Sequence, residues 1–371
     1  MAEETTIELK RAALNHYFQN LNTPQQQAVF HVNGPVLVLA GAGSGKTTAM
    51  IHRIVQMIHF GDGWVQANAS ITKEDAAYLK DYIADKQPAD LERLFSILAV
   101  QPIQPWHILA ITFTNKAANE LRSRLLQAIG EECASMLHAS TFHSACVRIL
   151  RRSISKLGYD SNFTIYDTDD SQRLMKSCIA DADVSEKQFP PRAVLTEISL
   201  AKDRMCSPEY FCIEAGSDYR KMVIGKLYKE YQNRLKSANA LDFDDLIYKT
   251  VELLESFSEE LEYYQNRFRY IMVDEYQDTN HAQFRLVQLL SQKHQNLCVV
   301  GDDDQSIYRF RGATIENILN FEKQFQNAVV IRLEQNYRST KTILEAANDV
   351  IAHNAGRKEK TLWTDLEDGK K

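Results

Sequence analysis

Residues 40–47 read AGAGSGKT, and few folds place such a glycine-rich stretch between a strand and a helix. It follows PVLVLA (residues 35–40), a short apolar run typical of a strand buried on both faces. After it, TTAMIHRIVQMIHF (residues 47–60) has apolar residues at helical spacing. Glycines let successive backbone amides and the helix N-terminus turn toward an anion. The sequence therefore predicts a phosphate-binding loop.

Four further apolar runs resemble the first one and are separated by segments with helical spacing. They lie at residues 108–113, 270–273, 297–300 and 328–333. Short apolar runs that alternate with helices indicate a parallel sheet covered by helices. The predicted fold class is α/β, and the length of 371 residues allows two or three domains.

The positions of the predicted loop have distinct chemical roles. Lys46 is expected to reach the β and γ phosphates, and the Thr47 hydroxyl is expected to bind Mg²⁺. The strict pattern begins with glycine, whereas this chain has the small residue Ala40. The expected nucleotide contacts are Ala40, Gly41, Ala42, Gly43, Ser44, Gly45, Lys46, Thr47 and Thr48.

Two carboxylates follow the apolar run at residues 270–273. Asp274 is placed to hold Mg²⁺, and Glu275 to polarise a water for attack on the γ phosphate. An acidic pair after a strand is often only a solvated turn, so the pair gains weight from the loop upstream. Together the two motifs predict hydrolysis of ATP or GTP.

Composition excludes several classes of protein. The net charge of −6 argues against a coat protein for nucleic acid or a polybasic membrane binder, so any polyanion must meet a local patch. The six cysteines show no zinc-ligand spacing, which favours reduced thiols in the cytoplasm. The acidic N-terminus is unlike a signal peptide, and no apolar run approaches the ~18 residues of a membrane span.

Eight motifs in order identify a family resemblance. They are QQQAV, AGAGSGKT, ITFTNKAANEL, STFHSA, LDFDDLI, VDEYQDTN, VVGDDDQSIYRFRGA and LEQNYRST. The chain resembles the UvrD/Rep/PcrA family of superfamily 1 DNA helicases from about residue 21 to residue 363, outside residues 61–106. The resemblance implies a RecA-like P-loop NTPase domain with a mostly helical inserted subdomain.

The resemblance also implies roles around the nucleotide. Gln25 reads the adenine edge, Tyr337 stacks on the adenine, Gln305 senses the γ phosphate, and Arg338 supplies positive charge during phosphoryl transfer. Thr48 stands where many relatives have arginine near the base. The implied catalytic residues are Lys46, Asp274, Glu275, Gln305 and Arg338.

Single-stranded DNA is implied to cross three of the motifs, where flat rings and polar groups suit stacked bases and phosphates. Phe310 stands where relatives usually have tryptophan, so we expect weaker stacking. From sequence alone, Phe113 also suits a core position and His143 a helix cap. The implied DNA contacts are Phe113, Asn115, Lys116, Thr141, His143, Tyr308, Phe310 and Arg311.

Two further charged groups carry no assigned role. Arg148, Arg151, Arg152 and Lys156 lie near helical spacing and suit either phosphate contact or a solvated helix face. The carboxylates of LDFDDLI (residues 241–247) resemble a metal site, but by the resemblance they are structural or coupling residues, and no metal is assigned to them.

The expected domain organisation follows from these segments. Residues 1–150 and 237–332 form the first motor domain, with an insertion of unknown role at about 61–106. Residues 151–236 form the helical subdomain, and residues 333–371 begin a truncated second motor domain. Because translocation needs two lobes that close around ATP, the chain is expected to be an N-terminal fragment that does not unwind DNA alone.

The predicted function is an ATP- and Mg²⁺-dependent DNA helicase or translocase core, of 3′ to 5′ polarity by the resemblance. Its expected partners are single-stranded DNA, single/double-strand junctions and repair or replication proteins, with no membrane. Three alternatives stay open: a translocase that strips proteins from DNA, a nucleotide-switched DNA-binding module without catalysis, and a small-molecule P-loop kinase. The intact catalytic set disfavours the second, and the DNA-type aromatics disfavour the third.

Overall fold

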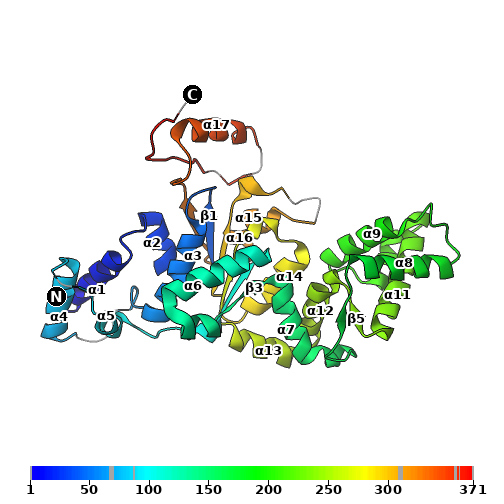
Figure 1. The fold of residues 1–371 in the computed structure, drawn as a ribbon, viewed down its shortest axis with the longest axis horizontal. Helices are drawn as coiled ribbons and strands as arrows, with labels where there is room; N and C mark the ends of the chain where they lie inside the picture. Colours follow the sequence, from blue (N-terminus) through cyan, green and yellow to red (C-terminus); the bar gives the residue numbers. More distant parts are fainter. Residues whose placement is uncertain are drawn as a thin grey trace.

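The computed structural model describes residues 2–66, 71–86, 88–307, 312–354, 357–358 and 360–369. Within them a sheet of six parallel strands forms the centre of the molecule, in the order β3-β2-β6-β7-β1-β8 (Figure 1). The α/β prediction is therefore confirmed. The strands are β1 (Val36–Ala40), β2 (Ile108–Thr112), β3 (His138–Thr141), β6 (Tyr270–Val273), β7 (Leu297–Gly301) and β8 (Val329–Leu333).

Helices cover both faces of the sheet because its strands are apolar on both sides. Val36 and Val38 of β1 belong to one core cluster, and Leu37 and Leu39 belong to the other. The first face is covered by α2 (Thr23–Phe30), α3 (Lys46–Val55) with the π-helix η1 (Gln56–Phe60), and α6 (Asn115–Met136). The helix α1 (Ala2–Tyr17) contributes to the same core cluster from beside the sheet (Figure 1). The second is covered by α7 (Phe142–Ser153), α12 (Phe243–Ser256), α13 (Ser258–Arg267), α14 (His281–Ser291), α15 (Glu316–Leu319) and α16 (Phe321–Gln324).

A helical region with a core of its own extends from the side of the sheet, in green at the right of Figure 1. Met175, Ile198 and Tyr228 are among its fully buried side chains. Two short strands, β4 (Thr164–Ile165) and β5 (Ala240–Leu241), pair in parallel at its base. Its helices are α8 (Thr168–Asp181), α9 (Pro191–Asp203), α10 (Pro208–Ala215) and α11 (Tyr219–Ser237).

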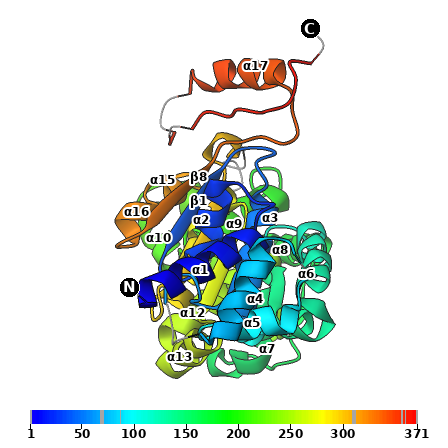
Figure 2. The ribbon, with the colours of Figure 1, turned by 90° about the vertical axis from the view of Figure 1, so that its left-hand side faces the viewer.

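The segment at residues 61–106 contains two helices, α4 (Lys73–Ile83) and α5 (Leu91–Leu98). They lie with α1 on the side of the sheet away from the helical region, in blue and cyan in Figures 1 and 2. Trp64 stacks on Phe30, the last residue of α2, with ring centroids 4.0 Å apart, so the segment contacts α2 through this pair of rings. The insertion is thus packed into the first core cluster.

The C-terminal segment leaves the sheet after β8 and stands apart from it, with α17 (Lys341–Ile351) on top in both ribbon views (Figures 1 and 2). The Asn336 amide donates to the Trp363 carbonyl at 2.7 Å, so the segment folds back on itself. Short 3₁₀ turns complete the described backbone: η2 (Pro105–His107), η3 (Ile154–Leu157), η4 (Tyr276–Asp278) and η5 (Asp303–Gln305). Among the described helices we find none with the length and apolar character of a membrane span.

Candidate functional site

The glycine-rich loop joins β1 to α3, as the sequence predicts. β1 ends at Ala40 and α3 begins at Lys46. Gly45 is the N-cap of α3 and has a φ of 82°, a left-handed conformation that favours glycine. At Gly41 a Cβ would lie 2.2 Å from Leu362 Cδ2, so the loop and the C-terminal segment approach closely. The amides of the loop and of the first turn of α3 are thus brought to the carboxyl edge of the sheet.

Lys46 and the two carboxylates after β6 meet at this edge. Lys46 Nζ lies 3.2 Å from Glu275 Oε2. Burial raises the pKa of the Asp274 carboxyl to about 6, and the adjacent Glu275 carboxylate adds to the shift. A buried carboxyl beside a second one is a position where a bound cation lowers the free energy of the charged form.

A chain of hydrogen bonds connects Glu275 to the residue predicted to sense the γ phosphate. Gln277 Nε2 donates to Glu275 Oε2 at 2.9 Å, and the Asp302 amide donates to Gln277 Oε1 at 3.0 Å. Gln305 Nε2 in turn donates to the Asp302 carboxylate. The carboxylates of residues 302–304 are close enough together to hold a metal ion, but the Lys360 ammonium lies among them.

The residues predicted to contact the base also lie at the loop. Gln25 Nε2 donates to the Ser44 carbonyl at 3.0 Å, and the Tyr337 amide donates to the Gly43 carbonyl at 3.0 Å. Asn22 joins the two sides, because its Nδ2 donates to the Tyr337 hydroxyl at 2.9 Å. The Tyr337 ring is half exposed, and a ring in that position is available for stacking.

The other two nucleotide residues have looser surroundings. Arg338 follows Tyr337 with an exposed side chain, and its amide donates to Asn336 Oδ1 at 2.7 Å. Thr48 lies in the first turn of α3, where its carbonyl contacts His52 Nδ1 at 2.8 Å. Neither contact positions the side chain on a phosphate or a base.

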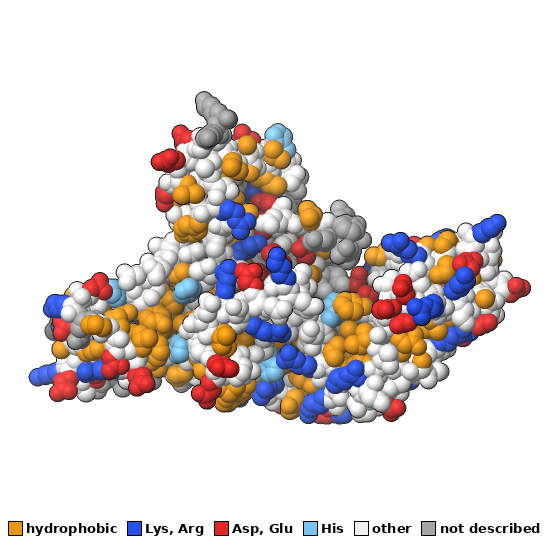
Figure 3. Space-filling model, in the orientation of Figure 1, with side chains coloured by type: hydrophobic (Ala, Val, Ile, Leu, Met, Phe, Trp, Pro, Cys, Tyr) orange, Lys and Arg blue, Asp and Glu red, His pale blue; other side chains and the backbone are white. Residues whose placement is uncertain are grey.

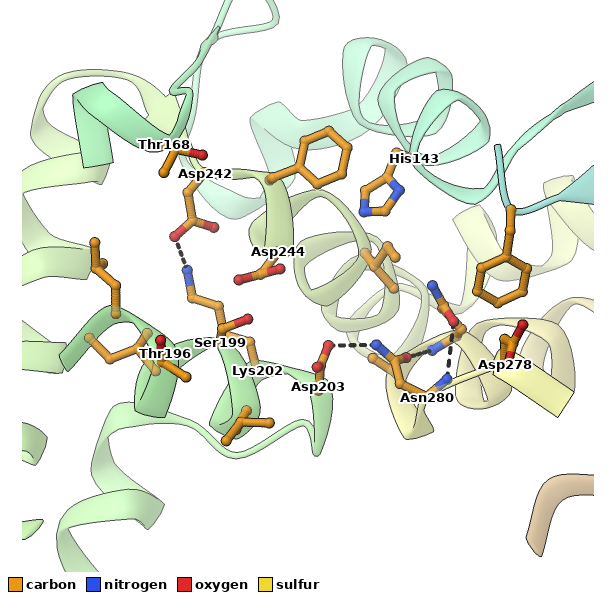
Figure 4. Close-up of a pocket in the computed structure, with 18 of the residues that line it drawn as sticks. His143, Thr168, Thr196, Ser199, Lys202, Asp203, Asp242, Asp244, Asp278 and Asn280 are labelled. Atoms are coloured by element: carbon orange, nitrogen blue, oxygen red, sulfur yellow. Dashed lines mark hydrogen bonds and ion pairs between the residues drawn. The ribbon is translucent and has the colours of Figure 1, made fainter. Parts of the chain in front are cut away.

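A cavity of 1240 Å³ runs from the two carboxylates to the helical region. Asp274, Glu275 and Gln305 line one end of it, and Phe113 and His143 line the wall beside α6 and α7. The cavity therefore adjoins both the predicted nucleotide site and two of the predicted DNA contacts. Figure 4 shows its inner surface, where Asn280, which follows β6 in the chain, faces Asp203 of α9 and donates to it.

His143 stacks on Phe243, with ring centroids 3.9 Å apart and an interplanar angle of 25°. Burial lowers the pKa of the His143 imidazole to about 4, so the ring is neutral at pH 7 and offers a flat surface rather than a charge. Phe243 is 56% exposed and lines the same cavity. The sequence analysis did not single out Phe243, although an aromatic ring between the acidic residues of LDFDDLI is a visible signal.

The remaining predicted DNA contacts have mixed positions. Asn115 and Lys116 begin α6 beside the cavity and are exposed. Thr141 is buried and caps α7, with its hydroxyl accepting from the Ser144 amide at 3.3 Å. Tyr308, Phe310 and Arg311 lie outside the described residues.

Most of the charged groups without an assigned role contact a group of opposite charge or an aromatic ring within the protein, whereas Arg148 contacts the His138 imidazole. Lys202 Nζ lies 2.6 Å from Asp242 Oδ2, a contact that Figure 4 marks. The LDFDDLI carboxylates, which resemble a metal site in sequence, thus face a lysine ammonium. Arg152 pairs with Glu260 at 3.0 Å, and Arg151 lies over the ring of Phe163. The described part of the face in Figure 3 shows cationic and acidic side chains intermixed, in keeping with the net charge.

Comparison with protein families matches two models to this chain. The UvrD/REP helicase N-terminal domain matches residues 21–68 and 91–326, and the UvrD-like helicase C-terminal domain matches residues 331–371. The stretch between residues 68 and 91, which the first model does not match, contains α4.

Curated relatives resemble nearly the whole chain. The ATP-dependent DNA helicase PcrA of Bacillus subtilis (strain 168) is 46% identical over 355 residues, which cover 96% of this chain and 42% of the relative. The protein of the same name from Staphylococcus aureus (strain Mu50) is 46% identical over 360 residues, which cover 97% of this chain and 43% of the relative. The chain thus spans less than half the length of these relatives.

Proposed function

This chain belongs to the UvrD/REP helicase family, and on that premise we propose that it forms the ATP-driven motor core of a DNA helicase or translocase. The observation that carries the proposal is one shared cavity, lined by Asp274, Glu275 and Gln305 at one end and by Phe113, His143 and Phe243 along its wall. Residues that would contact the γ phosphate and residues that would contact DNA line the same cavity, so a movement at one site would reach the other. Coupling of hydrolysis to movement along DNA requires such a connection.

The nucleotide site fits MgATP. The loop amides and Lys46 would hold the phosphates, and Thr47 and Asp274 would hold Mg²⁺, which supplies positive charge to the phosphate oxygens. Lys46 now pairs with Glu275, so turning Lys46 to a phosphate would release the Glu275 carboxylate to accept a proton from the attacking water. Gln305 and Arg338 would complete the charge around the γ phosphate.

The DNA side of the proposal depends on rings and on polar groups around them. Phe113, His143 and Phe243 present flat surfaces for bases, and stacking contributes about 1–3 kcal/mol per base. Asn115 and Lys116 lie beside the cavity for backbone contacts. Because stacking is indifferent to base identity, we propose binding of single-stranded DNA without sequence preference, as at a single/double-strand junction.

We also propose the domain division expected from the sequence. The helical region has its own buried core, which supports a subdomain at residues 151–236. The match of the second family model to residues 331–371 supports the start of a second motor domain at about residue 333. The six free cysteines support action in the cytoplasm. From the family of the chain, we propose repair or replication proteins as its partner class.

The test is ATP hydrolysis with and without single-stranded DNA, using Lys46→Ala as the blank. Phe243→Ala is expected to weaken DNA binding by about 1–3 kcal/mol while basal hydrolysis without DNA stays unchanged. Tyr219→Ala, an exposed aromatic on the helical region, is the matched control and should leave both measurements unchanged. Hydrolysis that persists in Lys46→Ala would refute the nucleotide site, and equal DNA affinity in Phe243→Ala would refute the stacking wall.

A further inference from the structure

A second, smaller cavity of 260 Å³ lies between β3, α7 and α13 and shares no lining residue with the first. His138 and Ser140 point into it from alternate positions of β3. Arg148 of α7 and Arg267 of α13 contribute two guanidinium groups. Since His138 is the first residue of its strand, this cavity opens toward the amino edge of the sheet, opposite the glycine-rich loop.

The contacts of His138 leave it with one unfavourable neighbour. Arg148 Nη1 lies 3.0 Å from its Nδ1, and Arg267 Nη2 lies 3.1 Å from its Nε2. A neutral imidazole accepts at one nitrogen and carries hydrogen on the other, whereas a guanidinium only donates. One of the two contacts therefore sets an N–H against an N–H, whichever tautomer is present.

The positive charge of the cavity is not neutralised by the protein. Within the described part of the chain neither Arg148 nor Arg267 has a carboxylate partner, and the side chains of both contact His138. Burial and the two guanidinium groups lower the pKa of His138 to about 4. Two cations thus converge on a neutral ring.

A buried hydroxyl in the same cavity has no hydrogen-bond partner. Ser140 is 1% exposed, and its Oγ is buried without a donor or acceptor within reach. Leaving such a group unpaired costs about 1–3 kcal/mol, so native proteins usually satisfy it. A ligand oxygen in the cavity would accept from this hydroxyl and from the arginines at once.

We propose that this cavity binds a small organic oxyanion, a phosphate monoester or carboxylate attached to an apolar body. The oxyanion would bridge Arg148 and Arg267, relieve the opposed N–H groups at His138 and accept from Ser140. Leu109, Ile149 and Phe268 line the rest of the cavity and suit the apolar body. The small volume of the cavity and the depth of Ser140 favour a small molecule over the backbone of a nucleic acid.

The test measures binding of phenyl phosphate by calorimetry to the full chain in a Lys46→Ala background, which silences the phosphate loop. We expect Arg267→Met and Ser140→Ala each to weaken binding, by about tenfold or more for the arginine, since one charge-assisted hydrogen bond is lost. Arg269→Met is the matched control, because Arg269 is exposed nearby but does not line the cavity, and its affinity should equal the parent's.

Equal affinity in Arg267→Met and Ser140→Ala would overturn the proposal, as would binding that is present in the wild type and absent in Lys46→Ala. If Arg267→Met does not fold, judged by circular dichroism, Ser140→Ala and Arg148→Met decide the question. A short DNA duplex that displaces phenyl phosphate and itself depends on Arg267 would assign the site to nucleic acid and refute the small-molecule ligand.

Discussion

Lys202 and Lys360 are both buried lysines whose ammonium groups face several carboxylates. Lys202 Nζ lies 2.6 Å from Asp242 Oδ2 and 2.9 Å from Asp245 Oδ1. Lys360 Nζ lies 2.5–2.7 Å from one oxygen of each carboxylate at residues 302–304. In both clusters burial lowers the lysine pKa and the carboxylates more than reverse this, so each pKa lies above its ordinary value.

The supports around the two clusters differ. Asp242 also caps α12, because its Oδ1 accepts from the Asp245 amide at 2.8 Å, and its Oδ2 accepts from the Tyr231 hydroxyl at 3.1 Å. Lys202 thus joins three helices inside a core. Lys360 lies in a segment whose described helix, α17, buries only Leu344. A buried lysine paired with carboxylates therefore stabilises a helical core in one place and, in the other, a lightly packed segment beside the nucleotide site.

Lys202→Met should be the most damaging change of the two clusters. It leaves two carboxylates buried without a cation, and breaking a buried pair in this way costs about 3–5 kcal/mol. We expect the free energy of unfolding, measured by urea titration, to fall by about 3–5 kcal/mol and the urea midpoint to fall with it. Lys226→Met on the exposed face of α11 should change the free energy of unfolding by less than about 0.5 kcal/mol. Equal midpoints for the two variants would contradict the structural role of Lys202.

The Lys202 cluster also makes the stability of the protein depend on pH. Burial, and then Asp242, raises the pKa of Asp245 to about 6, above its ordinary value of 3.8. The folded state then binds this proton more tightly than the unfolded state, so the free energy of unfolding gains on the order of 1–3 kcal/mol as pH falls from about 6 to about 4.

Asp245→Asn should remove this gain. Asp203 and Asp274 also have raised pKa values, to about 7 and about 6, so the comparison must be the difference between wild type and variant across the pH range. Urea unfolding at pH 4.5 and pH 7.5 gives that difference. Parallel pH profiles for the two proteins would show that Asp245 is not the titrating group.

Most of the sheet was predictable because its strands are apolar on both faces. The runs that became β1, β2, β6, β7 and β8 stand out for that reason. The sequence analysis missed β3, whose residues read HAST. Small polar residues of this kind give no apolar signal, and only pairing with β2 at the edge of the sheet makes them a strand.

The site was predictable where its residues are neighbours in sequence. Lys46 and Thr47 follow from the loop motif, and Asp274 and Glu275 from the end of an apolar run. Contacts between distant segments gave no such signal. The Asn22–Tyr337 hydrogen bond spans 315 residues, and the Lys360 cluster joins segments more than 50 residues apart. Side-chain packing in three dimensions, rather than local pattern, decides these contacts.

Lys360→Met should have the smallest effect on global unfolding, although it removes the ammonium from three carboxylates, of which Asp304 keeps its ion pair with Arg357 at 2.8 Å. The destabilisation is limited because the C-terminal segment can unfold locally and expose the carboxylates to water. The cost therefore cannot exceed the free energy of that local unfolding. We expect the free energy of unfolding, measured by urea titration, to change by less than about 1 kcal/mol while hydrogen exchange in α17 accelerates severalfold. Lys341→Met removes an exposed pair with Asp368 from the same segment and should leave exchange in α17 nearly unchanged. A midpoint shift as large as that of Lys202→Met would show that the C-terminal segment belongs to the cooperative core, and the contrast between the two lysines would then disappear.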